Sequence, residues 1–234
     1  MVLEELRPEV SLSRFVVDNL STFLSDQDFS LPTRQLFQFL YLPRYPEHFE
    51  SSLLLIENRK FNSAVALERP LFETSVRGMW IAHCASDKKL TDARANSWEL
   101  EFRGGWKTLQ GELDKTLGRT HSRVDGMKTF YKRASGFVHS GLRETGQNVR
   151  LEKPQVARHL LGHLRRQLPN AASLFVIFAL DFEKNLLSLV LTNTACGDAW
   201  ATKHNARIKT LLAFARSYKH MVATLRKSEE SVSS

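Results

Sequence analysis

Apolar side chains recur every three or four residues along most of this 234-residue chain, with polar side chains between them. That spacing places an apolar stripe on one face of each of a series of helices. No stretch of alternating apolar and polar residues is long enough to build a β-sheet, and no internal repeat is present. The sequence therefore predicts an all-α fold, a multi-helix bundle.

The predicted helices divide the chain into four parts of a single α-helical domain, residues 1–234. Residues 1–60 form an N-terminal helical extension, whose apolar content indicates packing onto the core or onto a second subunit. Residues 61–141 form the core, residues 142–226 add C-terminal helices, and residues 227–234 are a frayed polar tail. Residues 142–152 read equally well as a loop or a short two-stranded ribbon. The expected helices cover 11–24, 33–41, 46–59, 61–85, 88–118, 127–140, 154–168, 170–191 and 200–226.

Composition limits the class of protein. Hydrophobic residues make up 42% of the chain, which is ordinary for a globular protein. The longest apolar run, residues 174–180, is far too short to span a bilayer, so we expect no membrane association. The two cysteines, Cys84 and Cys196, form no CxxC pair, and the N-terminus does not read as a secretory leader. These features favour a cytoplasmic protein in which both thiols act as small buried hydrophobes.

The positive charge is concentrated in one part of the chain. The net charge is +8, and residues 119–166 alone contain eleven Lys or Arg and three Asp or Glu, which accounts for all of it. Such a segment indicates an anionic ligand, RNA or another polyanion. The alternative is a solvated basic face without a ligand. The candidate phosphate-binding residues are Lys132, Arg143, Arg158, Arg165 and Arg166.

Residues 128–141, Lys-Thr-Phe-Tyr-Lys-Arg-Ala-Ser-Gly-Phe-Val-His-Ser-Gly, carry the most specific motif. Tyr131, Ser135 and His139 follow one another at four-residue spacing, so they share one face of the predicted helix. Arg133 precedes His139 by six residues, which separates them by about 9 Å along the axis. A long guanidinium and an imidazole at this spacing can still converge on one ligand.

This Arg-x5-His segment resembles the Arg-x4-6-His signature of HEPN domains. A second stretch, Leu67-Glu-Arg-Pro-Leu-Phe-Glu-Thr-Ser-Val-Arg-Gly-Met-Trp80, is similar to a helix of bacterial HEPN-like proteins of unassigned function. The resemblance covers residues 61–141. It implies an all-α, dimeric protein and a metal-independent ribonuclease, either a toxin with a cognate antitoxin or a phage-defence effector. Ala134 departs from the family pattern, because family nucleases often carry Asn, Asp or His directly after the arginine.

The second stretch contains Arg69, Glu73 and Arg77 at four-residue spacing. One interpretation is a surface salt ladder, which contributes a few tenths of a kcal/mol per pair. The other places Glu73 and Arg77 in a cleft beside His139, where they orient Arg133 or a phosphate. Tyr131 and Ser135 would then support the same site.

An arginine and a histidine without a metal suit RNA cleavage by the RNA's own 2′-hydroxyl, since the substrate supplies the nucleophile. Arg133 and His139 are therefore the candidate catalytic residues, and no cofactor is expected. His159 and His163 have the spacing of a zinc pair, but no carboxylate or thiol accompanies them, so no metal site is expected.

Three interpretations remain open at this point. The chain is a HEPN-type ribonuclease, a catalytically inactive HEPN-like module that binds RNA, nucleotide or a protein partner, or an unrelated helical protein with a coincidental motif. The structural alternative for the pair itself is that His139 caps the C-terminus of its helix and Arg133 pairs with Glu73 or another acid.

Overall fold

The computed structural model describes residues 2–25, 31–96, 98–102, 105–118, 154–192 and 198–233. Every regular element within these ranges is an α-helix, so the predicted all-α multi-helix bundle is confirmed. Residues 127–140, predicted to form the motif helix, and residues 142–152, predicted as a loop or ribbon, lie outside the described residues.

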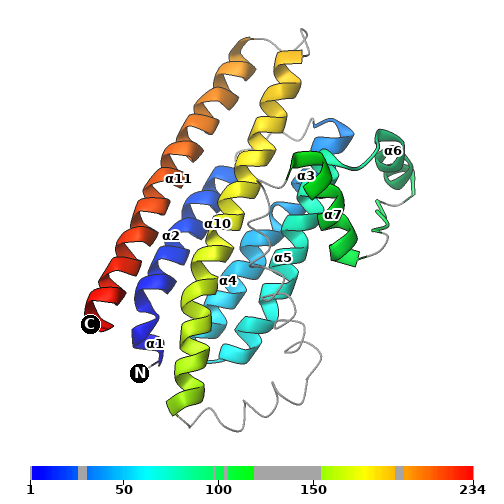
Figure 1. The fold of residues 1–234 in the computed structure, drawn as a ribbon. Helices are drawn as coiled ribbons and strands as arrows, with labels where there is room; N and C mark the ends of the chain where they lie inside the picture. Colours follow the sequence, from blue (N-terminus) through cyan, green and yellow to red (C-terminus); the bar gives the residue numbers. More distant parts are fainter. Residues whose placement is uncertain are drawn as a thin grey trace.

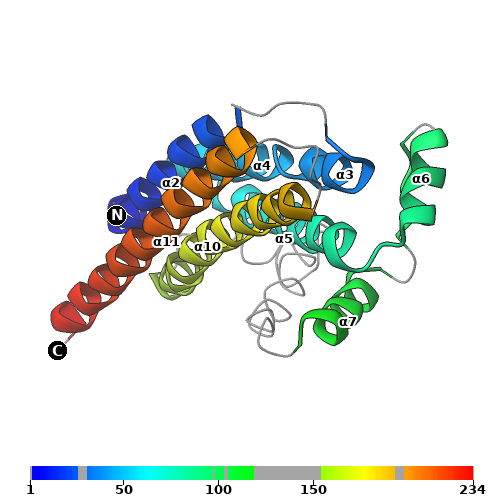
Figure 2. The ribbon, with the colours of Figure 1, turned by 90° about the horizontal axis from the view of Figure 1, so that it is seen from above.

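Long helices run side by side through most of the molecule (Figure 1). The helix α10 is central, because it contacts helices from both ends of the chain, from α1 and α2 to α11. Figure 2 shows α6 and α7 at one end of the molecule, away from α11. The described helices are α1 (Val2–Glu5), α2 (Arg7–Ser25), α3 (Thr33–Tyr41), α4 (Arg44–Glu57), α5 (Phe61–His83), α6 (Asp87–Ala95), α7 (Gly105–Leu117), α10 (Pro154–Thr192) and α11 (Asp198–Ser233).

A tight turn makes α4 and α5 antiparallel neighbours. Arg59 adopts a left-handed backbone conformation with φ 59°, and the Lys60 N–H donates to the Leu55 carbonyl at 2.7 Å. This bond satisfies a carbonyl at the C-terminal end of α4, as in a Schellman motif. The chain reverses within three residues, and α4 packs along α5.

The helix α5 lies between two apolar clusters and contributes to both. Ala64, Val65 and Leu71 join a large cluster formed with α2, α4, α10 and α11. Further along α5, Phe72 and Trp80 join a second cluster formed with α3, α6 and α7. Pro70 lies inside α5, which continues through it as one helix rather than ending there. Both ends of the molecule are therefore organised around the same helix.

Gly78 brings α5 and α10 into close contact. A Cβ atom at Gly78 would lie 2.0 Å from Cζ and 2.5 Å from Cε2 of Phe178, which is fully buried on α10. The Phe178 ring thus occupies the space that any side chain at position 78 would need. Nearby, Tyr45 of α4 stacks on Phe175 with ring centroids 5.1 Å apart, and its hydroxyl donates to the Ala171 carbonyl at 2.7 Å.

Residues 154–168 and 170–191 form one helix, α10, so the predicted break between them is wrong. Pro169 removes one backbone donor inside a helix, at a cost of about 3 kcal/mol. Packing on both sides offsets this cost. Leu168 and Ala172 are buried in the core, and the Tyr218 hydroxyl of α11 donates to the Pro169 carbonyl at 2.8 Å.

The single helix predicted over residues 88–118 is also wrong, because the chain forms α6 and α7 with a connection between them. Trp98 and Gly105 have φ values of 66° and 69°, which a right-handed helix cannot contain. Two aromatic residues of the connection contact neighbouring helices. Trp98, which is 44% exposed, lies against Phe37 of α3, and Phe102 lies edge-on against Trp80 of α5.

Two further boundaries differ from the predictions. The helix α11 continues to Ser233, so residues 227–233 are helical rather than frayed, and no Pro or Gly interrupts them. Residues 1–60 are part of the main core and not an extension of it. Val17, Leu20 and Phe49 from this region are buried in the same cluster as Phe175. The apolar surface that had suggested a second subunit therefore packs within the chain.

The contact between Gly78 and Phe178 predicts opposite effects for two alanine substitutions within helices. Gly78→Ala should lower the free energy of unfolding by about 1–3 kcal/mol, the usual cost of overpacking a core. Gly111→Ala in α7 is the matched control, because no atom beyond its own stretch of helix lies within 4 Å of the position that a Cβ would occupy. It should raise stability by about 0.5–1 kcal/mol. Urea denaturation followed by circular dichroism measures both. Equal effects from the two substitutions would contradict the close approach.

Candidate functional site

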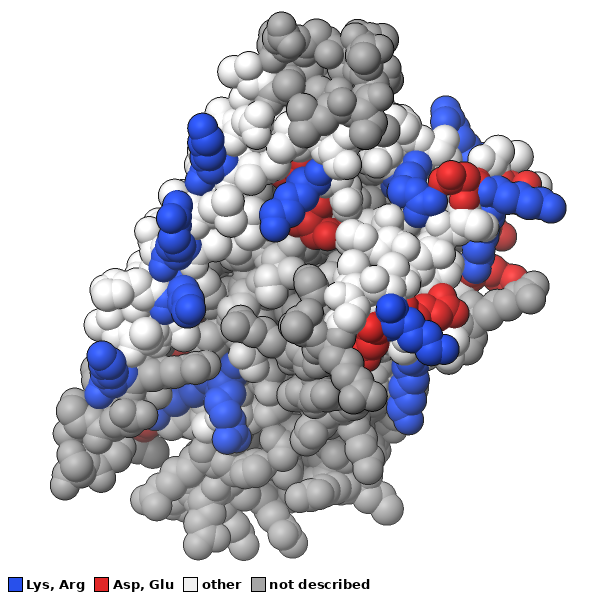
Figure 3. Space-filling model, turned by 45° about the horizontal axis from the view of Figure 1, so that its top comes forward, with Lys and Arg blue, Asp and Glu red and all other residues white. Residues whose placement is uncertain are grey.

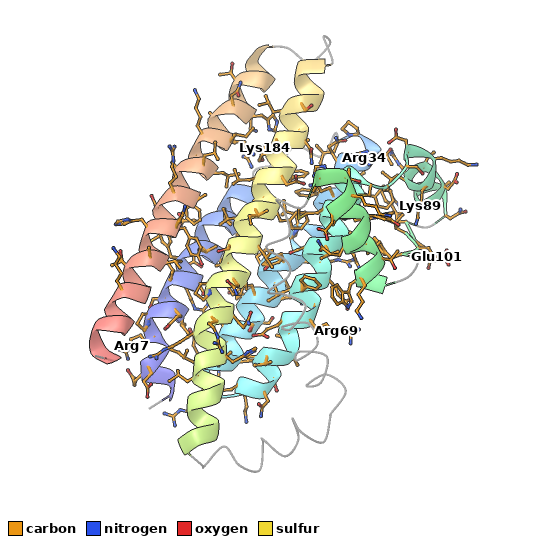
Figure 4. The ribbon with its side chains drawn as sticks, viewed as in Figure 1. Arg7, Arg34, Arg69, Lys89, Glu101 and Lys184 are labelled. Carbon is orange, nitrogen blue, oxygen red and sulfur yellow. The ribbon has the colours of Figure 1, made fainter. Side chains whose placement is uncertain are left out.

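Three charged residues form a ladder along α5. Glu73 accepts from Arg69 Nε at 2.9 Å through one carboxylate oxygen and from an Arg77 terminal nitrogen at 3.2 Å through the other. Only 19% of the Glu73 side chain is exposed. The predicted salt ladder is therefore present, and Figure 4 shows Arg69 projecting from α5. Counted by themselves, the three residues carry a charge of +1.

Aromatic residues surround the end of this ladder at Arg77. The Arg77 guanidinium lies 5.0 Å from the centroid of the Phe102 ring, and the Phe102 ring packs edge-on against Tyr41. Burial raises the pKa of Tyr41, against the opposing charges of Arg77 and Arg44. Arg44 lies 5.5 Å from the Tyr41 ring centroid. This arrangement holds two guanidinium groups against neutral aromatic rings.

The residues of the predicted catalytic pair and most of their neighbours lie outside the described residues. The structure therefore does not test the interpretation that Glu73 and Arg77 line a cleft beside His139. The helix of Arg158 is described but its side chain is not. The predicted site residues that lie outside the described residues are Tyr131, Lys132, Arg133, Ser135, His139 and Arg143.

The two remaining candidate phosphate ligands occupy different environments. Arg165 is half-buried, donates to the Glu5 carbonyl at 3.1 Å and lies 3.5 Å from a Glu9 carboxylate oxygen. It therefore joins α10 to the N-terminal helices, which argues against a role in binding an external phosphate. Arg166, the next residue, is exposed. Arg166 remains available to a ligand in solution.

In the described part of the chain, three histidine–carboxylate pairs join helices, and none of them was predicted from the sequence. His163 of α10 lies 3.3 Å from Glu68 of α5, and His83 of α5 lies 2.7 Å from Asp181 of α10. The two acids of α10, Asp181 and Glu183, interrupt an otherwise apolar stretch of the sequence. That interruption was the available signal, because an acid on a buried face needs a partner.

The third pair is the most deeply buried and includes an arginine. Glu183 of α10 is fully buried, and His204 Nδ1 lies 2.8 Å and Arg207 Nε 3.0 Å from its two oxygens. Burial alone would raise the pKa of Glu183, but the hydrogen bonds and charges of His204 and Arg207 outweigh it and lower the pKa overall. This cluster holds α11 against α10.

Other chemical functions find little support in the described part of the chain. No group of three or more His, Cys, Asp or Glu among its residues could hold a metal ion. Burial raises the pKa of the Cys84 thiol, which disfavours the reactive thiolate. A cavity of about 30 Å³ between α5, α7 and α10 has room for about one water molecule. No described helix is long and apolar enough to cross a membrane.

Comparison with known proteins gives one family. Residues 46–164, just over half of the chain, match a family described as a family of unknown function (DUF6988). No curated protein and no solved structure matches the chain.

The buried Glu183 cluster predicts a pH-dependent loss of stability. Glu183→Ala leaves His204 and Arg207 without their carboxylate and should lower the free energy of unfolding by about 3–5 kcal/mol at neutral pH. The folded pKa of Glu183 lies below the unfolded value of about 4.3, so its contribution is complete above the unfolded pKa and is lost as pH falls through the folded one. Denaturation of wild type and variant at neutral and acidic pH should show the difference shrinking in acid.

The exposed Glu99 provides a control for that measurement. Glu99→Ala should change stability by less than about 0.5 kcal/mol at either pH. A Glu183→Ala protein as stable as Glu99→Ala would show that the buried cluster does not hold α11.

Proposed function

The chain belongs to the DUF6988 family, and we propose that it is a metal-independent endoribonuclease, because two of its segments resemble HEPN domains. In this proposal Arg133 and His139 are the catalytic residues, and RNA is the substrate. The finer assignments that the resemblance implies are a homodimer and a role as a toxin, with a cognate antitoxin, or as a phage-defence effector. They are part of the same proposal.

The observation that carries the proposal is the Arg-x5-His motif of residues 128–141, which lies within the family match. Residues 46–164 include the stretch 67–80 on α5 and the motif segment 128–141, with the connection between them. The match supports treating the two segments as parts of one unit. It leaves out the first 45 residues, most of α10 and all of α11, so the catalytic proposal depends on the middle of the chain.

If Arg133 lies beside the ladder on α5, the charge of the ladder favours a phosphate as a further partner of Arg133. The main alternative for Arg133 was an ion pair with Glu73. Glu73 already accepts hydrogen bonds from Arg69 and Arg77 through both of its oxygens. A third guanidinium beside this carboxylate would leave an excess of two positive charges. A phosphate group would neutralise that excess.

The proposed chemistry requires only proton transfer and charge stabilisation. His139 accepts the proton of the RNA 2′-hydroxyl as its oxygen attacks the adjacent phosphorus. The bond to the 5′-oxygen of the next nucleotide breaks, and a proton returns to that oxygen. Arg133 binds the non-bridging oxygens as their charge increases. The products are a 2′,3′-cyclic phosphate, which hydrolyses to a 3′-phosphate, and a 5′-hydroxyl.

The remaining predicted site residues have supporting roles in this proposal. Tyr131 and Ser135, which precede His139 at four-residue spacing, would position it or the substrate. Glu73 and Arg77 would orient Arg133. Lys132, Arg143, Arg158 and Arg166 would hold neighbouring phosphates, an attraction that is independent of sequence and sensitive to salt.

A second candidate function is a catalytically inactive module that binds RNA. Ala134 favours it, because it stands where family nucleases often carry a polar residue. In that case Arg133 and His139 contact RNA without cleaving it.

The proposed activity predicts cleavage of single-stranded RNA in EDTA, with 2′,3′-cyclic or 3′-phosphate ends, and no cleavage of DNA of the same sequence. His139→Ala should reduce the rate by about 10²- to 10⁴-fold, the usual contribution of a positioned acid–base group. Arg133→Lys should fail nearly as badly, because an ammonium group cannot reproduce the bidentate contact of a guanidinium.

Lys88→Arg is the control substitution, because it keeps the charge of an exposed residue outside the proposed site and should leave the rate nearly unchanged. Circular dichroism checks that each variant is folded. Equal cleavage by wild type and His139→Ala would reject the catalytic assignment. If the wild type binds RNA but cleaves none, the inactive module replaces the nuclease.

A further inference from the structure

The outer face of α11 is basic, and the helix carries no acid over almost its whole length. Residues 199–228 contain seven Lys or Arg and no Asp or Glu. Figure 3 shows Lys and Arg side chains in a row along the edge of the molecule where α11 lies. This helix lies outside the family match and outside the basic segment 119–166, so its charge is a separate observation. The exposed basic residues of α11 are Lys203, Lys209, Arg216, Lys219 and Lys227.

The inner face of α11 is fully used in packing. His204, Leu211 and Tyr218 are buried at seven-residue spacing, which makes one stripe along the helix. This stripe packs against α10 and α2, and Phe214 stacks on Phe15 of α2 with ring centroids 5.4 Å apart. The remaining surface of α11 faces solvent. The helix is therefore a fixed support for its basic side chains.

Three of the basic residues lie on one line. Arg216 lies seven residues after Lys209, and Lys227 lies eighteen residues after Lys209. At 100° per residue, both intervals place the later side chain within about 20° of the direction of Lys209 around the helix axis. The line extends about 27 Å at 1.5 Å per residue. All three side chains are exposed, and none of them forms an ion pair with an acid in the described part of the chain. By contrast, Arg207 pairs with the buried Glu183 on the inner side of the helix.

The neighbouring helix α10 does not neutralise this face. Its sequence contains only two acids, Asp181 and Glu183, and both are engaged inside the protein, with His83 and with His204 and Arg207. On α10, Lys184 is exposed and adds to the positive charge (Figure 4). The surface formed by residues 199–228 of α11 and the adjacent part of α10 is therefore positive, and the acids of α11 lie at its two ends, Asp198 at one and Glu229 and Glu230 at the other.

We propose that the outer face of α11, centred on Lys209, Arg216 and Lys227, binds the phosphate backbone of single-stranded nucleic acid. A row of exposed cations on a rigid helix attracts a linear polyanion, and the attraction does not depend on base sequence. Between the basic residues are small side chains such as Ala206, Ala213 and Ala223, which leave the charged groups accessible. The face shares its ligand class with the proposed function but requires no cleavage.

An anionic membrane is a less suitable occupant of this face. Helices that lie in a membrane surface bury bulky apolar side chains in the lipid. On α11 those side chains pack against α10 and α2, and Leu212, which is 39% exposed, is the one large apolar residue that the described part of α11 exposes. The charge is present, but the apolar surface that would insert is not.

The test measures binding of a fluorescein-labelled 2′-O-methyl oligouridylate, which a 2′-hydroxyl mechanism cannot cleave, by fluorescence anisotropy at salt concentrations from about 50 to 200 mM. Wild-type affinity should fall steeply as salt rises. The triple variant Lys209→Ala/Arg216→Ala/Lys227→Ala should bind at least about tenfold more weakly at low salt. Its slope of log affinity against log salt should be smaller by about 2, since each phosphate contact on a single strand contributes about 0.7.

A charge-matched control removes three exposed lysines from elsewhere, in Lys60→Ala/Lys88→Ala/Lys115→Ala. This control should change the slope by less than about 1. Equal losses in the two triple variants would overturn the proposal, because they would reflect net charge alone. Unchanged binding by the α11 variant would also overturn it. Circular dichroism checks that both variants are folded.

Vesicles of phosphatidylcholine and phosphatidylserine test the alternative that an anionic membrane binds the outer face of α11. If wild type sediments with these vesicles, the α11 variant does not, and both bind the oligonucleotide equally, the face is a membrane site and the proposal fails. Failure of the nuclease proposal can be distinguished from failure of this binding proposal. A wild type that cleaves no RNA but loses oligonucleotide binding through the α11 substitutions retains this inference and loses only the catalysis.

Discussion

The contact between Gly78 and Phe178 sets the distance between α5 and α10, and the rest of the structure depends on that distance. The helix α5 contributes to both apolar clusters, and α10 contacts helices from both ends of the chain. Because a Cβ at position 78 would overlap the Phe178 ring, the two helices can approach this closely only with glycine there. Two further pairs connect the same helices. Glu68 and His163 precede Gly78 and Phe178 on α5 and α10, and His83 and Asp181 follow them.

The acids Glu68 of α5 and Asp181 and Glu183 of α10 form ion pairs within the protein, and this leaves the outer face of α11 positive. Glu68, Asp181 and Glu183 each join two helices by pairing with a histidine, and Glu183 also pairs with an arginine. Buried carboxylates require such partners, since an isolated charge in the interior is costly. Because these acids are used internally, none of them is left to balance the exposed basic side chains of α11. The exposed basic side chains of α11 therefore form a row of cations along one helix instead of a surface of mixed charge.

The sequence predicted what depends on local periodicity and missed what depends on tertiary contacts. The all-α bundle follows from the apolar spacing, and residues 33–41 form a helix with the predicted ends. The ladder of Arg69, Glu73 and Arg77 follows from four-residue spacing within one helix. In contrast, α10 continues through Pro169 because packing against the core and the hydrogen bond from Tyr218 outweigh the tendency of proline to end a helix. The histidine–carboxylate pairs join residues far apart in the chain, so no local pattern could match each acid to its histidine.

The central claim is that RNA contacts two separate parts of this chain, the motif segment 128–141 and the outer face of α11. Photo-cross-linking with single-stranded RNA that contains 4-thiouridine tests it most directly, in the His139→Ala variant so that the RNA stays intact. Digestion and mass spectrometry then identify the attached peptides. The account predicts cross-links in residues 128–141 and in α11, both reduced by rising salt. Cross-links confined to α4, α6 or α7, or the absence of any salt-sensitive cross-link, would contradict it.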